Sequence, residues 1–246
     1  MEIITSLQNN KIKELNRLND KKYRDETNLF LVEGDHLVDE AYKKNQLVEV
    51  LITEDFKSNY DIKTTYISEE VMKKISMMKS PSKIIGVCKK FNPLSYGNRL
   101  IILDNIQDPG NLGTIIRSAA SFNFDTVVLG DTCVDLYNDK VIRSSEGMIF
   151  NIDVIRRNLI DFIDELKKSN YWIYSTDVRG GTTLLDTLFD KKMAIIIGNE
   201  GLGVSTEIKK LVDSNIYIPM NKKCESLNAS VAASIIMYEV SKLDYE

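Results

Sequence analysis

The sequence is poor in the side chains that bind metals or crosslink small proteins. It contains one histidine, His36, and three cysteines, Cys88, Cys133 and Cys224, which form no Cys-x-x-Cys pair. An odd number of widely spaced cysteines indicates neither a zinc site nor a disulfide framework. We therefore expect a protein of a reducing cytoplasm that holds no metal.

Long apolar runs and an excess of positive charge are also missing. No apolar run approaches the roughly 18 residues of a membrane span, and the first residues lack the pattern of a signal peptide. The net charge of −4 provides no global attraction to nucleic acid, so an RNA partner would need a local basic patch. One candidate patch, which a solvated helix face explains equally well, consists of Lys11, Lys13, Arg17, Lys21, Lys22 and Arg24.

The fingerprints of dinucleotide and phosphate binding are absent. Neither Gly-x-Gly-x-x-Gly nor a phosphate loop ending in Gly-Lys-Ser/Thr occurs. The nearest pattern is Gly198-Asn-Glu-Gly-Leu-Gly203, and Glu200 within it would repel a pyrophosphate. A cationic or zwitterionic ligand is better accommodated, which argues against a nucleotide-dependent oxidoreductase.

The 246 residues, of which 43% are hydrophobic, suit two α/β domains. We predict domains over residues 1–92 and 98–246, joined by the turn-rich segment 92–98. In the first domain we expect helices over 4–24 and 36–44 and from Tyr66 onward, the last with Ser68 as its N-cap. Strands are expected at 29–33, 47–53 and 84–89.

In the second domain, short apolar runs alternate with helical segments. The expected strands are 100–104, 126–129, 172–176, 193–197 and 216–218, and the expected helices are about 111–122, 138–147, 158–168, 205–212 and 227–241. Because these strands are apolar rather than alternating, they predict a parallel sheet covered on both faces.

Three polar loops lie at the ends of strands in this domain. The first is Asn105-Ile-Gln-Asp-Pro-Gly-Asn-Leu-Gly-Thr-Ile-Ile-Arg117, the second is Gly198–Gly203, and the third is Ile218-Pro-Met220 leading to Ser226-Leu-Asn228. Spacings of three place Asn111, Thr114 and Arg117 on one helix face. These loops supply amides, a carboxylate, a guanidinium and a hydroxyl. That set suits orienting a polar substrate beside a cofactor, although turns and helix caps explain each loop taken alone.

Taken in order, the three loops resemble the motifs of the SpoU, or TrmH-type, RNA 2′-O-ribose methyltransferases of the SPOUT superfamily. The resemblance covers about residues 99–241 and includes the segment 134–145, although Glu146 stands where a small residue is commoner. Residues 30–41 resemble the family's ribosomal-protein-L30e-like substrate-binding domain. The usual closing Thr-Pro-Gln-Gly of that domain reads Ser80-Pro-Ser-Lys83 here.

The resemblance implies a methyltransferase that uses S-adenosylmethionine and modifies a ribose 2′-hydroxyl of RNA. Ribosomal RNA is favoured as the substrate, and transfer RNA is the alternative substrate. The alternative function is that of a non-catalytic RNA-binding protein of the same fold. It also implies a C-terminal trefoil knot, which is otherwise very rare in proteins, and a homodimer. The cofactor would lie against Gly198, Gly201, Ile218, Met220 and Leu227.

The family's catalytic positions correspond to Arg117, Asn111, Glu200, Ser226 and Asn228. Because a guanidinium is almost never deprotonated in a protein, we expect Arg117 to clamp an RNA phosphate rather than act as a base. Glu200 would orient Asn111 and Arg117. The remaining two would position the ribose and the methionyl end of the cofactor.

Overall fold

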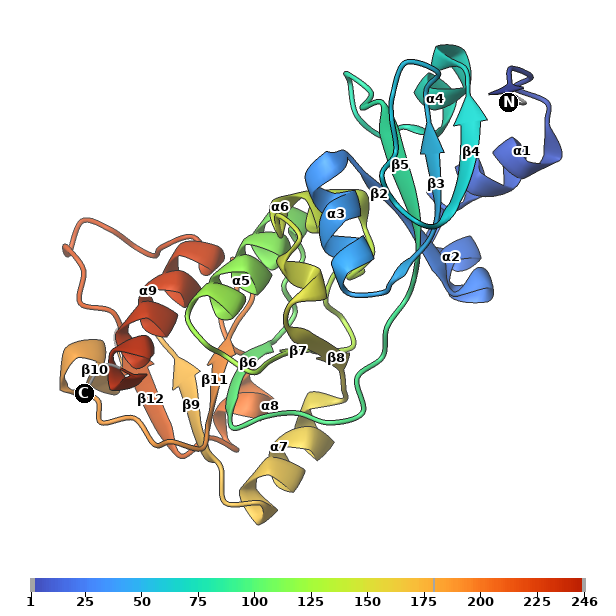
Figure 1. Cartoon of the computed structure of the whole chain (residues 1–246). Coiled ribbons are helices and arrows are strands. Elements are labelled where there is room, and N and C mark those ends of the chain that lie inside the picture. Colours follow the sequence, from blue (N-terminus) through green and yellow to red (C-terminus); the bar gives the residue numbers. More distant parts are fainter. Residues whose placement is uncertain (1–2, 179, 245–246) are drawn as a thin grey trace. The chain divides into compact units, whose positions relative to one another are not determined.

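The chain folds into two compact units in the computed structural model, which describes residues 3–178 and 180–244 (Figure 1). The outermost residues of both predicted domains therefore lie outside the described residues. The N-terminal unit combines the chain up to Phe91 with Asp135–Phe150, which we term the inserted segment. The C-terminal unit combines Asn92–Val134 with the chain from Asn151 onward.

A mixed sheet with the order β1-β4-β3-β5-β2 forms the centre of the N-terminal unit. Its strands are β1 (Ile3–Ile4), β2 (Leu29–Glu33), β3 (Leu47–Ile52), β4 (Lys63–Ile67) and β5 (Ile84–Lys89). Strands β1, β4 and β3 run parallel, whereas β5 pairs antiparallel with β3 and β2. The helices are α1 (Asn10–Arg17), α2 (Lys21–Thr27), α3 (Asp35–Lys43) and α4 (Glu69–Ile75), with α6 (Asp139–Ser144) and the 3₁₀ helix η1 (Met148–Phe150) in the inserted segment.

The single helix predicted over residues 4–24 is wrong. The chain forms β1, α1 and α2 there, because two polar side chains each begin a new helix. Asn9 accepts a hydrogen bond from the backbone N–H two residues further on at 2.9 Å, and Asp20 does the same at 2.7 Å. Such N-caps satisfy donors that a helix start leaves unpaired, and each stabilises its helix by about 1 kcal/mol.

The inserted segment, which the sequence placed in the second domain, packs against the N-terminal sheet. The ring centroid of Tyr137 lies 4.7 Å from that of Phe30, and its hydroxyl donates to the carbonyl of Phe91 at 2.8 Å. The buried Arg24 pairs with Asp135 at 2.6 Å. Leaving one partner of a buried ion pair alone typically costs about 3–5 kcal/mol, so replacing either residue alone should destabilise this packing.

The C-terminal unit contains a sheet with the order β10-β12-β9-β11-β6-β7-β8, in which every described pair is parallel. Its strands are β6 (Arg99–Leu103), β7 (Thr126–Leu129), β8 (Asp153–Arg156), β9 (Trp172–Thr176), β10 (Thr182–Thr183), β11 (Met193–Ile197) and β12 (Ser214–Tyr217). After β6 the chain forms β7 and β8 beside one edge of β6, and it later forms β11 beside the opposite edge. Ligand sites of open parallel sheets lie at such a reversal, beyond the carboxyl ends of the strands.

Helices cover both faces of this parallel sheet (Figure 1). They are α5 (Pro109–Ser121), α7 (Leu159–Lys168), α8 (Thr206–Lys209) and α9 (Ala229–Ser241), with short 3₁₀ helices η2 (Leu184–Asp186) and η3 (Lys242–Asp244). Helices α7 and α8 bury Phe162 and Ile208 in one core cluster with Ile102 of β6. On the other face α5 and α9 lie side by side, and the hydroxyls of Ser118 and Ser234 are 2.7 Å apart.

The predicted α/β class with a parallel sheet is confirmed, and several strands have the predicted bounds, among them β7, β9 and β11. Strands β1, β4, β8 and β10 were missed. Strand β10 has two residues, β8 has four, and β4 (Lys63–Ile67) mixes polar and apolar side chains, so local patterns indicate them poorly. Ser68 caps α4 as predicted and accepts from Val71 N.

Candidate active site

The three motif loops meet beyond the carboxyl ends of neighbouring strands. The first follows β6 and runs into α5, and the second follows β11, which pairs with β6. The third follows β12 and leads into α9, which packs beside α5. The fold therefore gathers the first loop and the two later loops, which follow it much further along the chain, into one region of the C-terminal unit.

One hydrogen-bonded chain of side chains joins all three loops. Asn228 donates from Nδ2 to Oδ1 of Asn111 at 3.0 Å, and Asn111 donates from its own Nδ2 to Oε1 of Glu200 at 3.0 Å. Asn111 is buried. Leaving its amide unpaired there would cost about 1–3 kcal/mol, so the chain helps to hold the loops in register.

The groups at the two ends of this series of hydrogen bonds determine which atom donates in each bond. At one end, Oδ1 of Asn228 accepts from the backbone N–H groups of Ser230 and Val231 and so caps α9. Its amide nitrogen is thereby turned toward Asn111. At the other end, the carboxylate of Glu200 can only accept, so Asn111 must present its amide nitrogen there. Asn228 is thus both the N-cap of α9 and one part of the site.

Glu200 is held as a carboxylate. Burial alone would raise its pKa, but hydrogen bonds from Asn111 and from backbone N–H groups outweigh burial and lower the pKa on balance. Because the pKa is lower in the folded state, the stability that Glu200 contributes is present above the unfolded pKa. That contribution is lost as the pH falls through the folded pKa, so it is fully present at neutral pH, where Glu200 is ionised.

The second motif loop is a tight turn that only glycine permits at one position. Backbone hydrogen bonds in both directions join Asn199 and Gly203, at 3.0 and 2.9 Å. A Cβ atom on Gly198 would lie 2.1 Å from the backbone of Gly203 and Val204. Asn199 completes the loop, since its Nδ2 donates to the carbonyl of Asn105 at 2.8 Å.

A cavity of about 460 Å³ opens between these loops and β9. It falls within the range of about 300–1,000 Å³ that is typical of small-molecule sites. Its lining includes every residue predicted to bind the cofactor, namely Gly198, Gly201, Ile218, Met220 and Leu227. Of the predicted catalytic residues, Glu200 and Ser226 line it, whereas Asn111 and Asn228 are absent from its lining.

Arg117 lies on an exposed part of α5 and is not part of this lining. In the ranges that the structure describes, its guanidinium has no hydrogen-bond or ion-pair partner. Of the two residues that Glu200 was predicted to orient, it bonds to Asn111 and not to Arg117. The reason is geometric, because Asn111 lies at the start of α5, near the loop that carries Glu200, whereas Arg117 lies six residues further along.

Sequence reasoning missed several polar residues around the cavity. Asp104, at the end of β6, accepts from the backbone N–H of Ser205 at 2.7 Å and so supports the second motif loop. Asp177 and Lys209 line the cavity and form an ion pair at 2.6 Å. The position of Asp104 directly after an apolar strand was a usable signal, whereas Asp177 and Lys209 lie 32 positions apart and carried none.

Two kinds of site are absent from the described ranges, 3–178 and 180–244. No three or more His, Cys, Asp or Glu side chains gather there in a group that could hold a metal ion. Likewise, no helix in these ranges has the length and apolar character to cross a membrane.

Known proteins share both the motifs and the fold. Residues 98–238 match the SpoU rRNA methylase family, and residues 9–86 match the MRM3-like substrate-binding domain. The chain belongs to the SpoU rRNA methylase family. This SpoU methylase is 38% identical to the 23S rRNA (guanosine(2553)-2′-O)-methyltransferase RlmP of Bacillus subtilis, over 98% of its own length and 99% of that relative.

Solved structures agree with this assignment. The AdoMet-bound rRNA methyltransferase from Sinorhizobium meliloti is 25% identical and superimposes with a TM-score of 0.88 over 98% of both chains. An RNA 2′-O ribose methyltransferase is 26% identical, with a TM-score of 0.86 over 100% of both chains. The predicted family is confirmed. So is the predicted function of this SpoU methylase, S-adenosylmethionine-dependent methylation of a ribose 2′-hydroxyl in RNA.

Proposed function

We propose that this SpoU methylase modifies a guanosine ribose of 23S ribosomal RNA. The observation that carries the proposal is the similarity to RlmP, which extends over both units and nearly the whole of both chains. A match limited to the C-terminal unit would support ribosomal and transfer RNA equally. The intact chain of Glu200, Asn111 and Asn228 supports an active enzyme over a non-catalytic RNA-binding protein.

Mapping of 2′-O-methyl groups in RNA from cells with and without the gene tests this substrate. We expect one guanosine of 23S rRNA to lose its methyl group when the gene is absent. Loss of a mark in transfer RNA alone would establish the alternative substrate. Identical methylation maps from cells without the gene and from cells that express the protein would favour the non-catalytic alternative.

The residues around the cavity fit S-adenosylmethionine. The glycine loop can bring its backbone close to a ligand, and the carboxylate of Glu200 suits a cationic one. When bound, this cofactor supplies a methyl group activated by a positively charged sulfur. We assign its binding to Gly198, Gly201, Ile218, Met220 and Leu227, which line the cavity.

The protein's own residues then align the RNA and stabilise the negative charge that develops on the ribose oxygen. The exposed guanidinium of Arg117 clamps the phosphate beside the target ribose and stabilises the oxygen as it loses its proton. That phosphate accepts the proton, since Arg117 cannot. The Ser226 hydroxyl, which lines the cavity, positions the ribose. Asn111 and Asn228 hold the loops that carry these groups.

Replacing Glu200 with glutamine should keep cofactor affinity within a few-fold and slow methyl transfer about tenfold, the effect of losing one charge-assisted hydrogen bond. The carboxylate now accepts from Asn111 through one oxygen and from Nδ2 of Asn199, at 3.4 Å, through the other. A glutamine would oppose one of these donors with a donor of its own. Single-turnover rates at saturating cofactor measure the effect.

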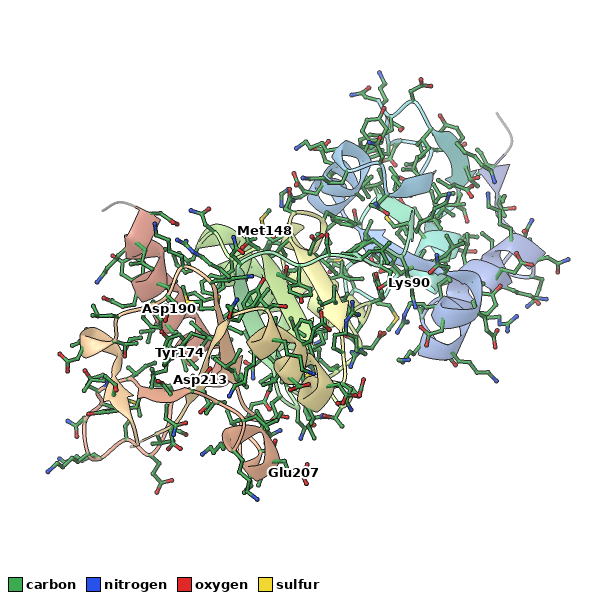
Figure 2. The ribbon with its side chains drawn as sticks, turned by 90° about the horizontal axis from the view of Figure 1, so that it is seen from below. Lys90, Met148, Tyr174, Asp190, Glu207 and Asp213 are labelled. Carbon is green, nitrogen blue, oxygen red and sulfur yellow. The ribbon has the colours of Figure 1, made fainter. Side chains whose placement is uncertain are left out.

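The matched control is Glu207→Gln, which removes an exposed carboxylate of α8 outside the cavity lining (Figure 2). This variant should react at the normal rate. A normal single-turnover rate for Glu200→Gln as well would reduce Glu200 to a residue that only shapes the loop.

We assign RNA recognition largely to the N-terminal unit, which matches a substrate-binding domain. The structure narrows the basic patch expected from the sequence. Lys11 contacts the buried carboxylate of Glu49 and donates to Thr65 at 2.6 Å, so it serves the fold. Lys13 and Lys22 are exposed and form no ion pair within the described chain, which leaves them available to phosphates.

The double replacement of Lys13 and Lys22 with glutamine should weaken RNA binding and flatten its dependence on salt. Each phosphate contact that is lost should reduce the log–log slope by roughly 0.7–0.9. Titration of RNA at several salt concentrations measures the slope. Replacing Lys191 and Lys210, two exposed lysines of the C-terminal unit, makes an equal change of charge as the control. Equal slopes for both double variants would refute the assignment.

We further propose a homodimer with a C-terminal trefoil knot, acting in the cytoplasm where ribosomal RNA is modified. Helix α9 supports the dimer because Val231, Ile235 and Tyr238 form an exposed apolar stripe, with Tyr238 55% exposed. A second copy would cover this stripe. Light scattering of the purified protein, with Ile235→Glu for comparison, tests the dimer.

A further inference from the structure

The described lining of the cofactor cavity contains three carboxylates, of Asp177, Glu200 and Glu225, and one ammonium group, of Lys209. We propose that this charge makes the enzyme bind S-adenosylmethionine more tightly than the demethylated product, S-adenosylhomocysteine, with Glu225 as a specificity-determining residue. The inference rests on the proposed placement of the cofactor in this cavity. It goes beyond that placement because it concerns discrimination between substrate and product.

Four charged residues line the cavity in the described part of the chain, and two of them neutralise each other. Lys209 donates to the carboxylate of Asp177 at 2.6 Å. Glu200 and Glu225 remain. Glu200 accepts from neutral amide and backbone donors, and Glu225 has no ion-pair partner among the described residues. Among the described residues, the lining therefore offers a ligand two carboxylates without a cationic partner.

Methyl transfer changes the charge of the cofactor by one. A bond forms between the methyl carbon and the ribose oxygen, and the carbon–sulfur bond breaks with its electron pair going to sulfur. The ribose proton goes to the acceptor described above. Before transfer, the sulfonium, ammonium and carboxylate give a net charge of about +1; afterwards the cofactor is a neutral zwitterion. A negative cavity attracts the first species and not the second, so product release is favoured after each turnover.

Glu225 allows this effect to be measured apart from the geometry of the site. Glu200 belongs to the hydrogen-bonded chain, so changing it also disturbs the motif loops. Glu225 is exposed and lies in the segment that precedes α9. For a carboxylate several ångströms from the ligand charge in a partly solvated cavity, the Coulomb energy corresponds to about two- to tenfold in affinity.

Calorimetric titration of the whole protein tests the proposal with three ligands: S-adenosylmethionine, S-adenosylhomocysteine and sinefungin, which carries a cationic amine in place of the sulfonium. The unmodified protein should bind both cationic ligands more tightly than S-adenosylhomocysteine, and the difference should shrink at high salt. In Glu225→Gln, affinity for the cationic ligands should fall about two- to tenfold, with a change below about twofold for S-adenosylhomocysteine.

Lys223→Gln is the control, because it removes a charge of opposite sign from the same exposed segment outside the cavity lining. It should leave the preference for the cationic ligands undiminished. Equal losses for all three ligands in Glu225→Gln, or no change for any, would overturn the inference and leave the proposed function standing. Failure of the unmodified protein to bind S-adenosylmethionine would instead overturn the proposed function.

Discussion

Replacing Arg117 with alanine should lower the rate of methyl transfer by at least about 10²–10³-fold, the effect of removing one donor that stabilises a developing oxyanion. Cofactor affinity should stay within a few-fold, because Arg117 lies outside the cavity lining. Folding should be unaffected, since the side chain is exposed and unpartnered in the described ranges. Single-turnover assays and cofactor titration on the same preparation separate these effects.

The conservative variant Arg117→Lys sharpens this test. Lysine keeps the charge but cannot make the planar, bidentate contact of a guanidinium with a phosphate, so this variant should also be nearly inactive. A well-folded Arg117→Ala protein that has lost cofactor binding would show that Arg117 belongs to the cofactor site. Near-normal activity of Arg117→Lys would mean that a point charge is sufficient.

Replacing Gly201 with valine should bring cofactor binding below detection while leaving the fold intact. A Cβ atom on Gly201 would meet only Oδ1 of Asn199, at 3.7 Å, which is an ordinary contact. The free protein therefore has room for a side chain at this position. A bound ligand that lies against the loop backbone leaves no such room. Calorimetric titration and thermal unfolding measure the two properties.

Gly201→Ala provides a graded comparison, since its smaller side chain should weaken binding less than valine. Gly198 would be the wrong choice for this test, because a Cβ atom there would collide with the backbone of Gly203 and Val204 and disturb the loop itself. Undiminished binding by Gly201→Val would show that the cofactor does not approach the loop at this position.

Several features were predictable because their causes are local in the chain. The apolar runs Thr126–Leu129 and Met193–Ile197 became buried strands with the predicted bounds, and Ser68 caps the helix that follows it. The motif loops were equally readable, since each follows an apolar run. Their meeting at one site follows from the parallel sheet, which brings the carboxyl ends of strands to one edge.

Other features depend on contacts between residues that are distant in sequence. Lys11 looked like part of an RNA-binding face until the fold brought Glu49 and Thr65 to its ammonium group. Glu200 was expected to orient both Asn111 and Arg117, yet of these two it bonds only to Asn111. In each case the local pattern was compatible with both outcomes. The distance between side chains on different elements decided between them.

The division of the chain into two units shows most clearly what local sequence patterns cannot predict. The sequence by itself determined the α/β class, the family and the order of the motif loops, because periodicity, caps and motifs are written in neighbouring residues. Only the tertiary structure decided that the inserted segment packs with the N-terminal unit, where Tyr137 meets Phe30 and Arg24 meets Asp135. A buried ring and a buried ion pair take their free energy from partners about 110 residues away, and no local pattern encodes those partners.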